Sequence, residues 1–371
     1  MIAPRSSQQS LMHRLGRALQ AHWWSPVSRR PPHQAWQMWV LAPLAGMYRA
    51  LYAVHRAWAI RNHAPWTPAQ GREVPTLVVG NWVVGGAGKT PTTLALLRHL
   101  QKQGWTPGVI SRGFGSEVSA VTLVRADTSV AHEVGDEPLL MARTAQVPVA
   151  VGRDRCAARR HLLEQHAEVD IVVADDGLQH HRLSRDLQVV VVDERGAGNG
   201  WCLPAGPLRE PIPPQLPPNT WVVYSGGEPT LALPGYRGQR RLTCVQSLQD
   251  WQAGAAPGAD GGWGALQGLT LHAAAGIAVP QRFFDLLEAR GLNLAATYAL
   301  PDHDAWKHAP WPTGTADAVI TEKDAVKLLA RPHAGPQSET RVWVARLDLH
   351  LPPEFLASVD ARLQALRPTI A

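Results

Sequence analysis

A run of small residues followed by lysine and threonine, Gly85-Gly86-Ala87-Gly88-Lys89-Thr90, has the composition of a phosphate-binding loop. Glycines let successive backbone N–H groups turn toward one point and form a concave anion site. In such loops the lysine ammonium reaches the β- and γ-phosphates of a nucleotide, and the threonine hydroxyl ligates Mg²⁺. The N-terminus of the helix that follows adds to the attraction. The sequence therefore predicts a site for ATP and Mg²⁺, in which Lys89 is also catalytic.

The loop departs from the general GxxxxGK[ST] pattern at one position, because Val83 stands where the pattern has glycine. We nevertheless count Val83 and Val84 among the nucleotide-binding residues, since a strand-like run precedes the loop and a helix-like run follows it. Two other nucleotide-site patterns do not fit. A dinucleotide-binding fingerprint would need glycine at position 91, which is proline, and the sequence has no guanine-specific NKxD motif.

Two carboxylates, Asp175 and Asp176, end a second apolar run. Carboxylates at the end of a buried strand beside a phosphate-binding loop are typical ligands of nucleotide-bound Mg²⁺. Paired aspartates after a strand can also form a turn and cap a helix. We favour the metal role, shared with Thr90, because both motifs are expected in one sheet. Which of the two carboxylates ligates the metal stays open.

These motifs need strands that end side by side, and the sequence has a matching pattern. Short apolar runs alternate with helix-length segments, of which Thr92–Gln103 and Arg153–His166 are two. The runs are Thr76–Gly80, Gly108–Ile110, Val147–Val151, Asp170–Ala174 and Leu187–Asp193. Such alternation predicts an α/β fold of the P-loop NTPase type, with a doubly wound and mainly parallel sheet that binds ligands at the carboxyl ends of its strands.

A stretch with seven prolines, Leu203–Pro218, predicts a loop or linker. Strand-like runs beyond it indicate a second, smaller α/β domain: Trp221–Tyr224, Leu269–Ala275, Ala318–Thr321 and Val342–Ala345. We therefore divide the chain into a basic, Trp-rich segment (1–60), a P-loop domain (61–187) and a C-terminal α/β domain that completes the cleft (188–371). The boundary between the last two is placed within 184–218.

The basic charge of the chain is confined to its front end. Residues 1–72 hold nine arginines and no lysine, aspartate or glutamate, whereas the rest holds 27 basic and 30 acidic residues. Six of the 15 tryptophans lie in the same front end. Tryptophan and arginine together are typical of membrane interfaces. Nucleic acid is not an expected partner, because the charge is not spread over a groove with aromatic stacking positions.

An apolar stripe within this front end has the three- and four-residue spacing of a helix face. Its members are Trp36, Val40, Leu44, Met47, Leu51, Val54 and Trp58. Arg49 and Arg56 share another face of the same helix. We expect a membrane-associated helix that lies in the interface or, less favoured, crosses as a single tilted span. Packing of the stripe against the protein's own core is the alternative.

Eight motifs, in order along almost the whole chain, resemble those of the tetraacyldisaccharide 4′-kinase family of lipid A biosynthesis. The family patterns GN-x₃-GG-x-GKTP, SRGYG, GDEP, DDGLQH, LPAGPLRE and GIA-x-P-x-RFF are matched at Gly80–Pro91, Ser111–Gly115, Gly135–Pro138, Asp175–His180, Leu203–Glu210 and Gly276–Phe284. Asp302-His303 and Thr321–Leu328 complete the set. Within the second pattern, Phe114 replaces the tyrosine.

The resemblance implies a kinase that transfers the γ-phosphoryl group of ATP to the 4′-hydroxyl of tetraacyldisaccharide 1-phosphate and so forms lipid IV-A. It implies a lipid substrate held in the bilayer, at the cytoplasmic face of the inner membrane, with the enzyme peripheral or anchored by one helix. A membrane-bound P-loop ATPase that acts as a switch on a protein partner is the alternative. It is less favoured, because Val84 stands where partition-type ATPases carry a signature lysine.

The resemblance also assigns roles to residues outside the loop. It implies that Asp136 is the base for the acceptor hydroxyl and that His303 supports it. From residue type alone, Asp136 also fits a helix N-cap and His303 a solvated loop. Three more residues are expected to face the cleft: Arg112, to contact a phosphate, and Arg209 with Glu210, to order the metal or the sugar.

Overall fold

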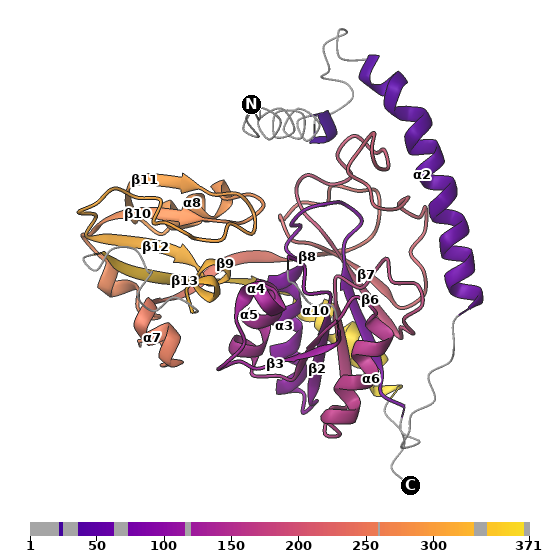
Figure 1. The fold of residues 1–371 in the computed structure, drawn as a ribbon, viewed down its shortest axis with the longest axis horizontal. Helices are drawn as coiled ribbons and strands as arrows, with labels where there is room; N and C mark the ends of the chain where they lie inside the picture. Colours follow the sequence, from indigo (N-terminus) through magenta and orange to yellow (C-terminus); the bar gives the residue numbers. More distant parts are fainter. Residues whose placement is uncertain are drawn as a thin grey trace, which may run out of the picture.

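The computed structural model of the chain describes residues 22–24, 36–62, 73–115, 120–258, 260–329 and 340–366. Two β-sheets with helices packed on them form the body, and one long helix lies along its side (Figure 1). The larger sheet has eight strands and the smaller has five. Most of the basic front end lies outside the described residues, including Trp66 and the arginines at positions 5, 14, 17, 29, 30 and 72.

The larger sheet has the strand order β3-β4-β2-β5-β1-β6-β7-β8, and only β3 and β4 pair antiparallel. Its strands are β1 (Thr76–Gly80), β2 (Pro107–Ser111), β3 (Thr122–Val124), β4 (Val149–Val151), β5 (Ile171–Asp175), β6 (Leu187–Val192), β7 (Thr220–Tyr224) and β8 (Tyr236–Arg237). The central strands β1, β2 and β5 are buried along their whole length, as apolar strands covered on both faces must be. The predicted α/β fold with a mainly parallel sheet is confirmed.

Helices cover both faces of this sheet: α3 (Lys89–Lys102), α4 (Ala131–Val134), α5 (Asp136–Ala145) and α6 (Arg155–Gln165). Alternate residues of β1 point to opposite faces, as strand geometry requires. Leu77 and Val79 join the apolar core that contains the buried leucines of α3, whereas Val78 joins the core that contains Leu162 of α6. The sheet is thus wound on both sides.

The smaller sheet has the order β11-β10-β12-β13-β9, and only β13 and β9 pair antiparallel. Its strands are β9 (Gln239–Ser247), β10 (Thr270–Ala275), β11 (Asn293–Ala299), β12 (Asp317–Thr321) and β13 (Arg341–His350). With them come α7 (Leu248–Ala253), the 3₁₀ turn η3 (Trp263–Leu266), α8 (Gln281–Glu288) and α9 (Glu322–Leu328). A second, smaller α/β unit was predicted and is confirmed.

The chain passes from the larger to the smaller sheet between β8 and β9, at Gly238. The range 184–218 expected for the boundary precedes β7 and β8, and both of these strands pair within the larger sheet. A strand-like run in the sequence does not reveal which sheet it joins. The last helix, α10 (Pro353–Gln364), returns to the larger unit, where Asp360 lies 2.8 Å from Nε2 of His99 on α3.

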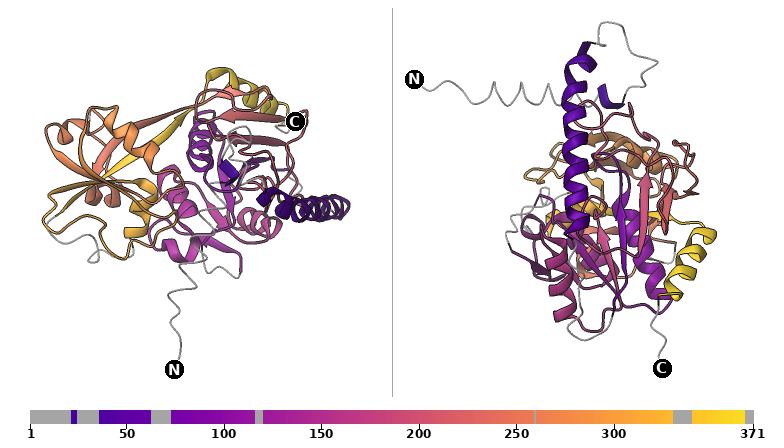
Figure 2. Two further views of the ribbon diagram at one scale, coloured as in Figure 1. Left: turned by 90° about the horizontal axis from the view of Figure 1, so that it is seen from above. Right: turned by 90° about the vertical axis from the view of Figure 1, so that its right-hand side faces the viewer.

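The long helix α2 (Trp36–Arg61) runs along the side of the larger unit that faces away from the smaller sheet (Figure 2). Its apolar stripe is exposed from Val40 to Trp58, with 62% of Leu51 and 68% of Val54 accessible to solvent. The described part of the stripe is therefore not packed against the core, which was the alternative to membrane contact. Within the described residues, no helix combines the length and the hydropathy needed to cross a bilayer.

Candidate active site

The phosphate-binding loop connects β1 to α3 as the sequence predicts. Gly85 and Gly88 have φ values of 88° and 93°, a backbone conformation that residues with a Cβ rarely adopt. A Cβ on Gly88 would also lie 3.1 Å from the Ser225 hydroxyl oxygen. Lys89 begins α3, and Gly88 caps that helix without a side chain of its own. These glycines let the loop bend back over the helix N-terminus, where anions bind.

The two valines that open the loop have other partners. Val83 is buried and forms a β-bridge with Leu208, and the N–H of Val84 donates to the Pro207 carbonyl at 2.9 Å. The backbone donors that remain for a phosphate therefore belong to the Gly85–Thr90 part of the loop. The bridge explains why valine replaces glycine at position 83, since this residue packs in the core rather than turning around an anion.

Lys89 lies beside Asp176, the residue that directly follows β5. Its Nζ donates to Oδ1 of Asn81 at 3.1 Å and is 3.6 Å from Oδ1 of Asp176. The Arg209 guanidinium binds the same Asp176 oxygen at 2.7 Å. Burial alone would raise the pKa of Asp176, but Lys89 and Arg209 outweigh it and hold this pKa at about 2. Asp176 is thus an anion that places two cations at the phosphate-binding loop.

Asp175 is the last residue of β5 and pairs in register with Val79 of β1, so it reaches the loop from the neighbouring strand. Its Oδ1 accepts from the Thr93 hydroxyl at 3.1 Å, whereas its buried Oδ2 has no hydrogen-bond partner among the described residues. Burial, Glu137 and Asp176 raise the pKa of Asp175 to about 7. A buried carboxylate oxygen without a partner, beside Asp176 and the first turn that holds Thr90, fits the oxygen ligands that Mg²⁺ prefers.

Asp136 and His303 are brought together from the two units. Nδ1 of His303 lies 2.9 Å and 3.2 Å from the two carboxylate oxygens of Asp136. Lys323 and Lys327, on the first helix after β12, lie 3.9 Å and 3.8 Å from Asp136. Burial opposes ionisation, but His303 and the two lysines lower the pKa of Asp136 to about 2. The carboxylate is therefore ionised and can accept a proton.

The capping role that residue type suggested for Asp136 is taken by another residue. The N-cap of α5 is Gly135, with φ 95°, and Asp136 is the first residue of the helix. The Asp136 carboxylate does accept the N–H of Glu137 at 2.9 Å, in addition to its contact with His303. A Cβ on Gly135 would lie 3.2 Å from Cα of Gly113, just after β2. This close approach sets the start of α5 against the carboxyl end of β2.

Comparison with known proteins assigns the chain to a family. Residues 37–364 match the family model described as tetraacyldisaccharide-1-P 4′-kinase. The tetraacyldisaccharide 4′-kinase of Methylibium petroleiphilum is 49% identical over 334 residues, which cover 89% of this chain and 91% of the relative. That of Leptothrix cholodnii is 49% identical over 340 residues, covering 90% and 96%. The chain belongs to the tetraacyldisaccharide 4′-kinase family. The resemblance drawn from its motifs is confirmed.

A solved structure agrees with the fold of this family member. The crystal structure of LpxK from Aquifex aeolicus in complex with ATP superposes with a TM-score of 0.67, at 22% identity. The match covers 87% of this chain and 98% of the other. The two-sheet architecture is therefore shared between kinases of distant sequence.

The other predicted residues of this kinase lie at different distances from the loop. Arg209 bridges Asp176 and Asn81, with its Nη1 3.3 Å from Oδ1 of Asn81. Glu210 is buried and binds Gln179 and Tyr52 rather than the loop itself. Arg112 follows β2 directly, is exposed, and contributes positive charge near Arg155. The structure thus brings Arg209 to the phosphate site and places Glu210 one layer further out.

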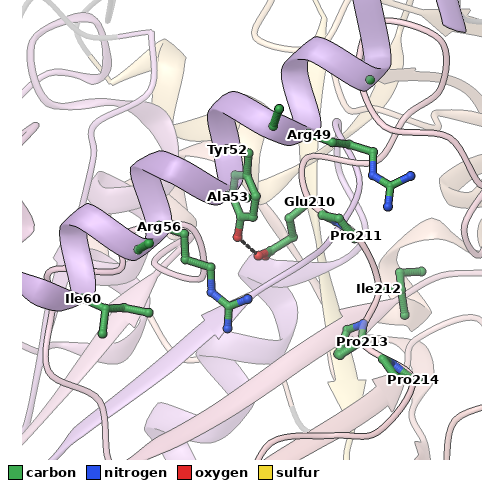
Figure 3. Close-up of a pocket in the computed structure, with 13 residues that line it drawn as sticks. Arg49, Tyr52, Ala53, Arg56, Ile60, Glu210, Pro211, Ile212, Pro213 and Pro214 are labelled. Carbon is green, nitrogen blue, oxygen red and sulfur yellow. Dashed lines mark hydrogen bonds between the residues drawn. The ribbon is translucent and has the colours of Figure 1, made fainter. Parts of the chain in front are cut away.

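A groove of about 800 Å³ separates α2 from the proline-rich loop of this kinase (Figure 3). Arg49, Tyr52 and Arg56 of α2 line one side, and Pro211, Ile212 and Pro213 line the other. The two guanidinium groups extend from the helix toward the loop (Figure 3). Mostly apolar walls with two cations suit an acylated, anionic ligand.

Four functional candidates were missed at the sequence level. Asn81 and Thr93 flank the loop and bind Lys89 and Asp175, and Lys323 and Lys327 surround Asp136. The lysines carried a signal, because residues four apart share a helix face and both lie in the matched Thr321–Leu328 motif. That motif was interpreted only as a helix start. Its capping role is present too, since Thr321 Oγ1 accepts the N–H of Asp324 at 3.2 Å.

Proposed function

We propose that this kinase transfers the γ-phosphoryl group of ATP to the 4′-hydroxyl of tetraacyldisaccharide 1-phosphate and forms lipid IV-A, with Mg²⁺ as its cofactor. The observation that carries the proposal is the meeting of two sets of groups at one end of the larger sheet. The phosphate-binding loop with Lys89 and Asp176 lies there. The Asp136–His303 pair lies there too, because α5 starts against Gly113 just after β2, and β2 pairs in parallel with β5, which ends at Asp175.

The loop side handles the nucleotide. Phosphoryl transfer depends mainly on positioning and on neutralising the charge of the transferred group. The N–H groups of the loop and the ammonium of Lys89 would grip the phosphates, while Arg209 supplies a second cation 2.7 Å from Asp176. Asp175, Asp176 and Thr90 are the residues that would hold Mg²⁺, which shields phosphate charge when it is bound.

The other side handles the acceptor. The ionised Asp136 accepts the proton of the attacking sugar hydroxyl, and His303 orients the carboxylate through its Nδ1. A proton acceptor that is already anionic needs no prior deprotonation at neutral pH. Lys323 and Lys327 keep it so, and they approach from the smaller unit together with His303.

We propose that α2 holds the enzyme at the cytoplasmic face of the inner membrane, where the lipid substrate lies. Support comes from the exposed stripe of α2, with Val40, Met47, Leu51, Val54 and Trp58 all more than half accessible. A run of exposed apolar side chains of this extent on a helix is typical of a membrane or protein contact. Arg49 and Arg56 beside it would attract the anionic phosphates of lipid headgroups.

The test of this function is transfer of ³²P from γ-labelled ATP to purified tetraacyldisaccharide 1-phosphate in mixed micelles, with and without Mg²⁺. We expect a labelled lipid product only when enzyme, lipid and Mg²⁺ are present together. The alternative of a nucleotide switch predicts release of inorganic phosphate at the same rate without the lipid. Folded enzyme that releases phosphate but labels no lipid would refute the kinase assignment.

The membrane contact predicts a large effect of charge on the exposed face of α2. Replacing Leu51 and Val54 with glutamate should lower the partition of the protein onto anionic phospholipid vesicles by about tenfold or more. Burying each side chain in the interface contributes about 1.5–3 kcal/mol, and 1.4 kcal/mol corresponds to tenfold. Vesicle sedimentation at several lipid concentrations measures this partition.

The matched control puts the same two negative charges on exposed positions of another helix, with the double variant Ala361→Glu, Gln364→Glu on α10. This variant should bind vesicles like the unmodified protein. Equal loss of binding in both variants would mean that net charge matters and the α2 stripe does not. Unchanged binding of the α2 variant would place the membrane contact elsewhere.

A further inference from the structure

Arg209 and Glu210 are held on both sides, by α2 and by residues that lie next to the phosphate-binding loop. The backbone N–H of Arg209 donates to the Trp82 carbonyl at 2.7 Å, next to the loop. Its guanidinium binds Asp176, and the Glu210 carboxylate accepts from Gln179 Nε2 at 2.7 Å. The Arg209 side chain therefore points into the polar groups around Lys89, and Glu210 is linked to them through Gln179, although the two residues belong to the proline-rich stretch between β6 and β7.

Two phenols of α2 hold Arg209 and Glu210 from the other side. The Tyr48 hydroxyl donates to the Arg209 carbonyl at 2.6 Å, and the Tyr52 hydroxyl donates to Oε2 of Glu210 (Figure 3). Tyr52 also lies 2.8 Å from Nε2 of His181. The two tyrosines are four residues apart and so share one face of the helix. Burial and the contact with Glu210 raise the pKa of Tyr52, so this phenol stays protonated and donates.

The contacts continue from Glu210 to the catalytic lysine. Gln179 Nε2 donates to the Asn81 carbonyl at 3.1 Å as well as to Glu210, and Asn81 Oδ1 accepts from Lys89. The chain of groups thus runs from Tyr52 through Glu210, Gln179 and Asn81 to Lys89. Each step is a hydrogen bond between residues that are buried or partly buried. Linked hydrogen bonds of this kind are stronger and more rigid than isolated ones.

We propose that Tyr48 and Tyr52 are positioning residues for phosphoryl transfer, through which α2 fixes Arg209, Asn81 and Lys89 in their working places. This rests on the proposed function and extends it, because α2 then takes part in the reaction as well as in membrane contact. Its apolar stripe faces away from the body. The hydrogen bonds of the two phenols would then connect a membrane-bound α2 to the residues that position the phosphate site.

The test uses full-length Tyr52→Phe and the Tyr48→Phe, Tyr52→Phe double variant, in two measurements. In the lipid kinase assay we expect kcat to fall about tenfold for the double variant, since small misplacements of catalytic groups cost up to about 10²-fold. The KM for the lipid and the partition onto vesicles should stay unchanged. Hydrogen–deuterium exchange of the segment 81–92 should become several-fold faster, because the groups that hold Asn81 are loosened.

The matched control is Tyr298→Phe, which removes another half-buried phenol bound to a histidine, here His272 at 2.9 Å in the smaller sheet. It should leave kcat and the exchange of 81–92 unchanged. Loss of activity confined to the lipid KM or to vesicle binding would overturn the proposal, because α2 would then only anchor. If the unmodified enzyme labels no lipid, the proposed function fails. The hydrogen–deuterium exchange of 81–92 then decides alone whether the two tyrosines position this segment. Unchanged exchange in the double variant refutes the positioning role.

Discussion

Replacing Asp136 with asparagine should lower kcat by about 10²–10⁴-fold, the usual contribution of a general base. Asparagine keeps the size of the side chain and its acceptor oxygen toward His303, but it cannot take the proton of the sugar hydroxyl. The KM for ATP should change little, because the loop that holds the nucleotide does not contact this residue directly. Initial rates of lipid phosphorylation at saturating ATP measure the effect.

The pH dependence of this loss follows from the ionisation of Asp136. The pKa of its carboxyl is about 2 in the folded protein, below the ordinary value of 3.8. The carboxylate is therefore ionised at every pH used in an assay, so the ratio of the two rates should be constant between about pH 6 and pH 9. The lowered pKa also stabilises the folded protein at pH values above the pKa of this carboxyl in the unfolded chain. This contribution is lost only as the pH falls from about 4 toward 2.

Asp317→Asn is the matched control for this variant. Asp317 is also buried and forms an ion pair with Arg341, whose Nε lies at 2.6 Å, and it accepts a hydrogen bond from Trp343 Nε1 at 2.8 Å. It is the first residue of β12, at the end of this strand that is away from Lys323 and Lys327. Its loss should lower the thermal midpoint without a comparable fall in kcat. A kcat within a few-fold of wild type for Asp136→Asn would show that the carboxylate is not the base.

Much of the larger sheet could be predicted because burial on both faces leaves a direct trace in sequence. The runs Thr76–Gly80 and Leu187–Asp193 coincide with β1 and β6 almost residue for residue. By contrast, β9 has buried and exposed residues in alternation only in its middle, from Arg241 to Cys244, and it carries arginines at 240 and 241, so its first half lacks an apolar run. The same holds for β11, where every second residue is exposed. Strands that face solvent on one side are less distinct from loops in sequence.

The site was predictable where a local pattern carries the chemistry, and less so where the fold assembles it. The glycine loop and the paired aspartates can each be recognised from a few consecutive residues. Asp136 and His303 are 167 residues apart, and only the family resemblance joined them before the structure did. Tyr48 and Tyr52 gave no signal at all, because their partners Arg209 and Glu210 lie about as far away along the chain. Contacts of such long separation cannot be deduced from spacing.

Replacing Lys89 with methionine should lower kcat by about 10²–10³-fold, the usual loss when one preorganised cation or donor is removed from a transition state. Methionine keeps most of the length and apolar stem of lysine but has no charge. In the unmodified protein the ammonium lies between Asn81 and Asp176, at 3.1 Å and 3.6 Å, so it is already aimed at the loop. Arg209 remains on Asp176 in the variant, and the loop should therefore keep its shape.

The control Lys102→Met removes the same charge from the exposed last turn of the same helix and should leave kcat unchanged. Comparing ATP affinity with kcat separates two ways in which Lys89 can act. If Lys89 only attracts the nucleotide, its replacement should raise the dissociation constant of ATP and leave kcat at saturating ATP unchanged. If Lys89 neutralises charge on the transferring phosphoryl group, its replacement should lower kcat even when every site is filled. The position of Lys89 at the start of α3, where the helix N-terminus and the ammonium act on the same anion, favours the second result.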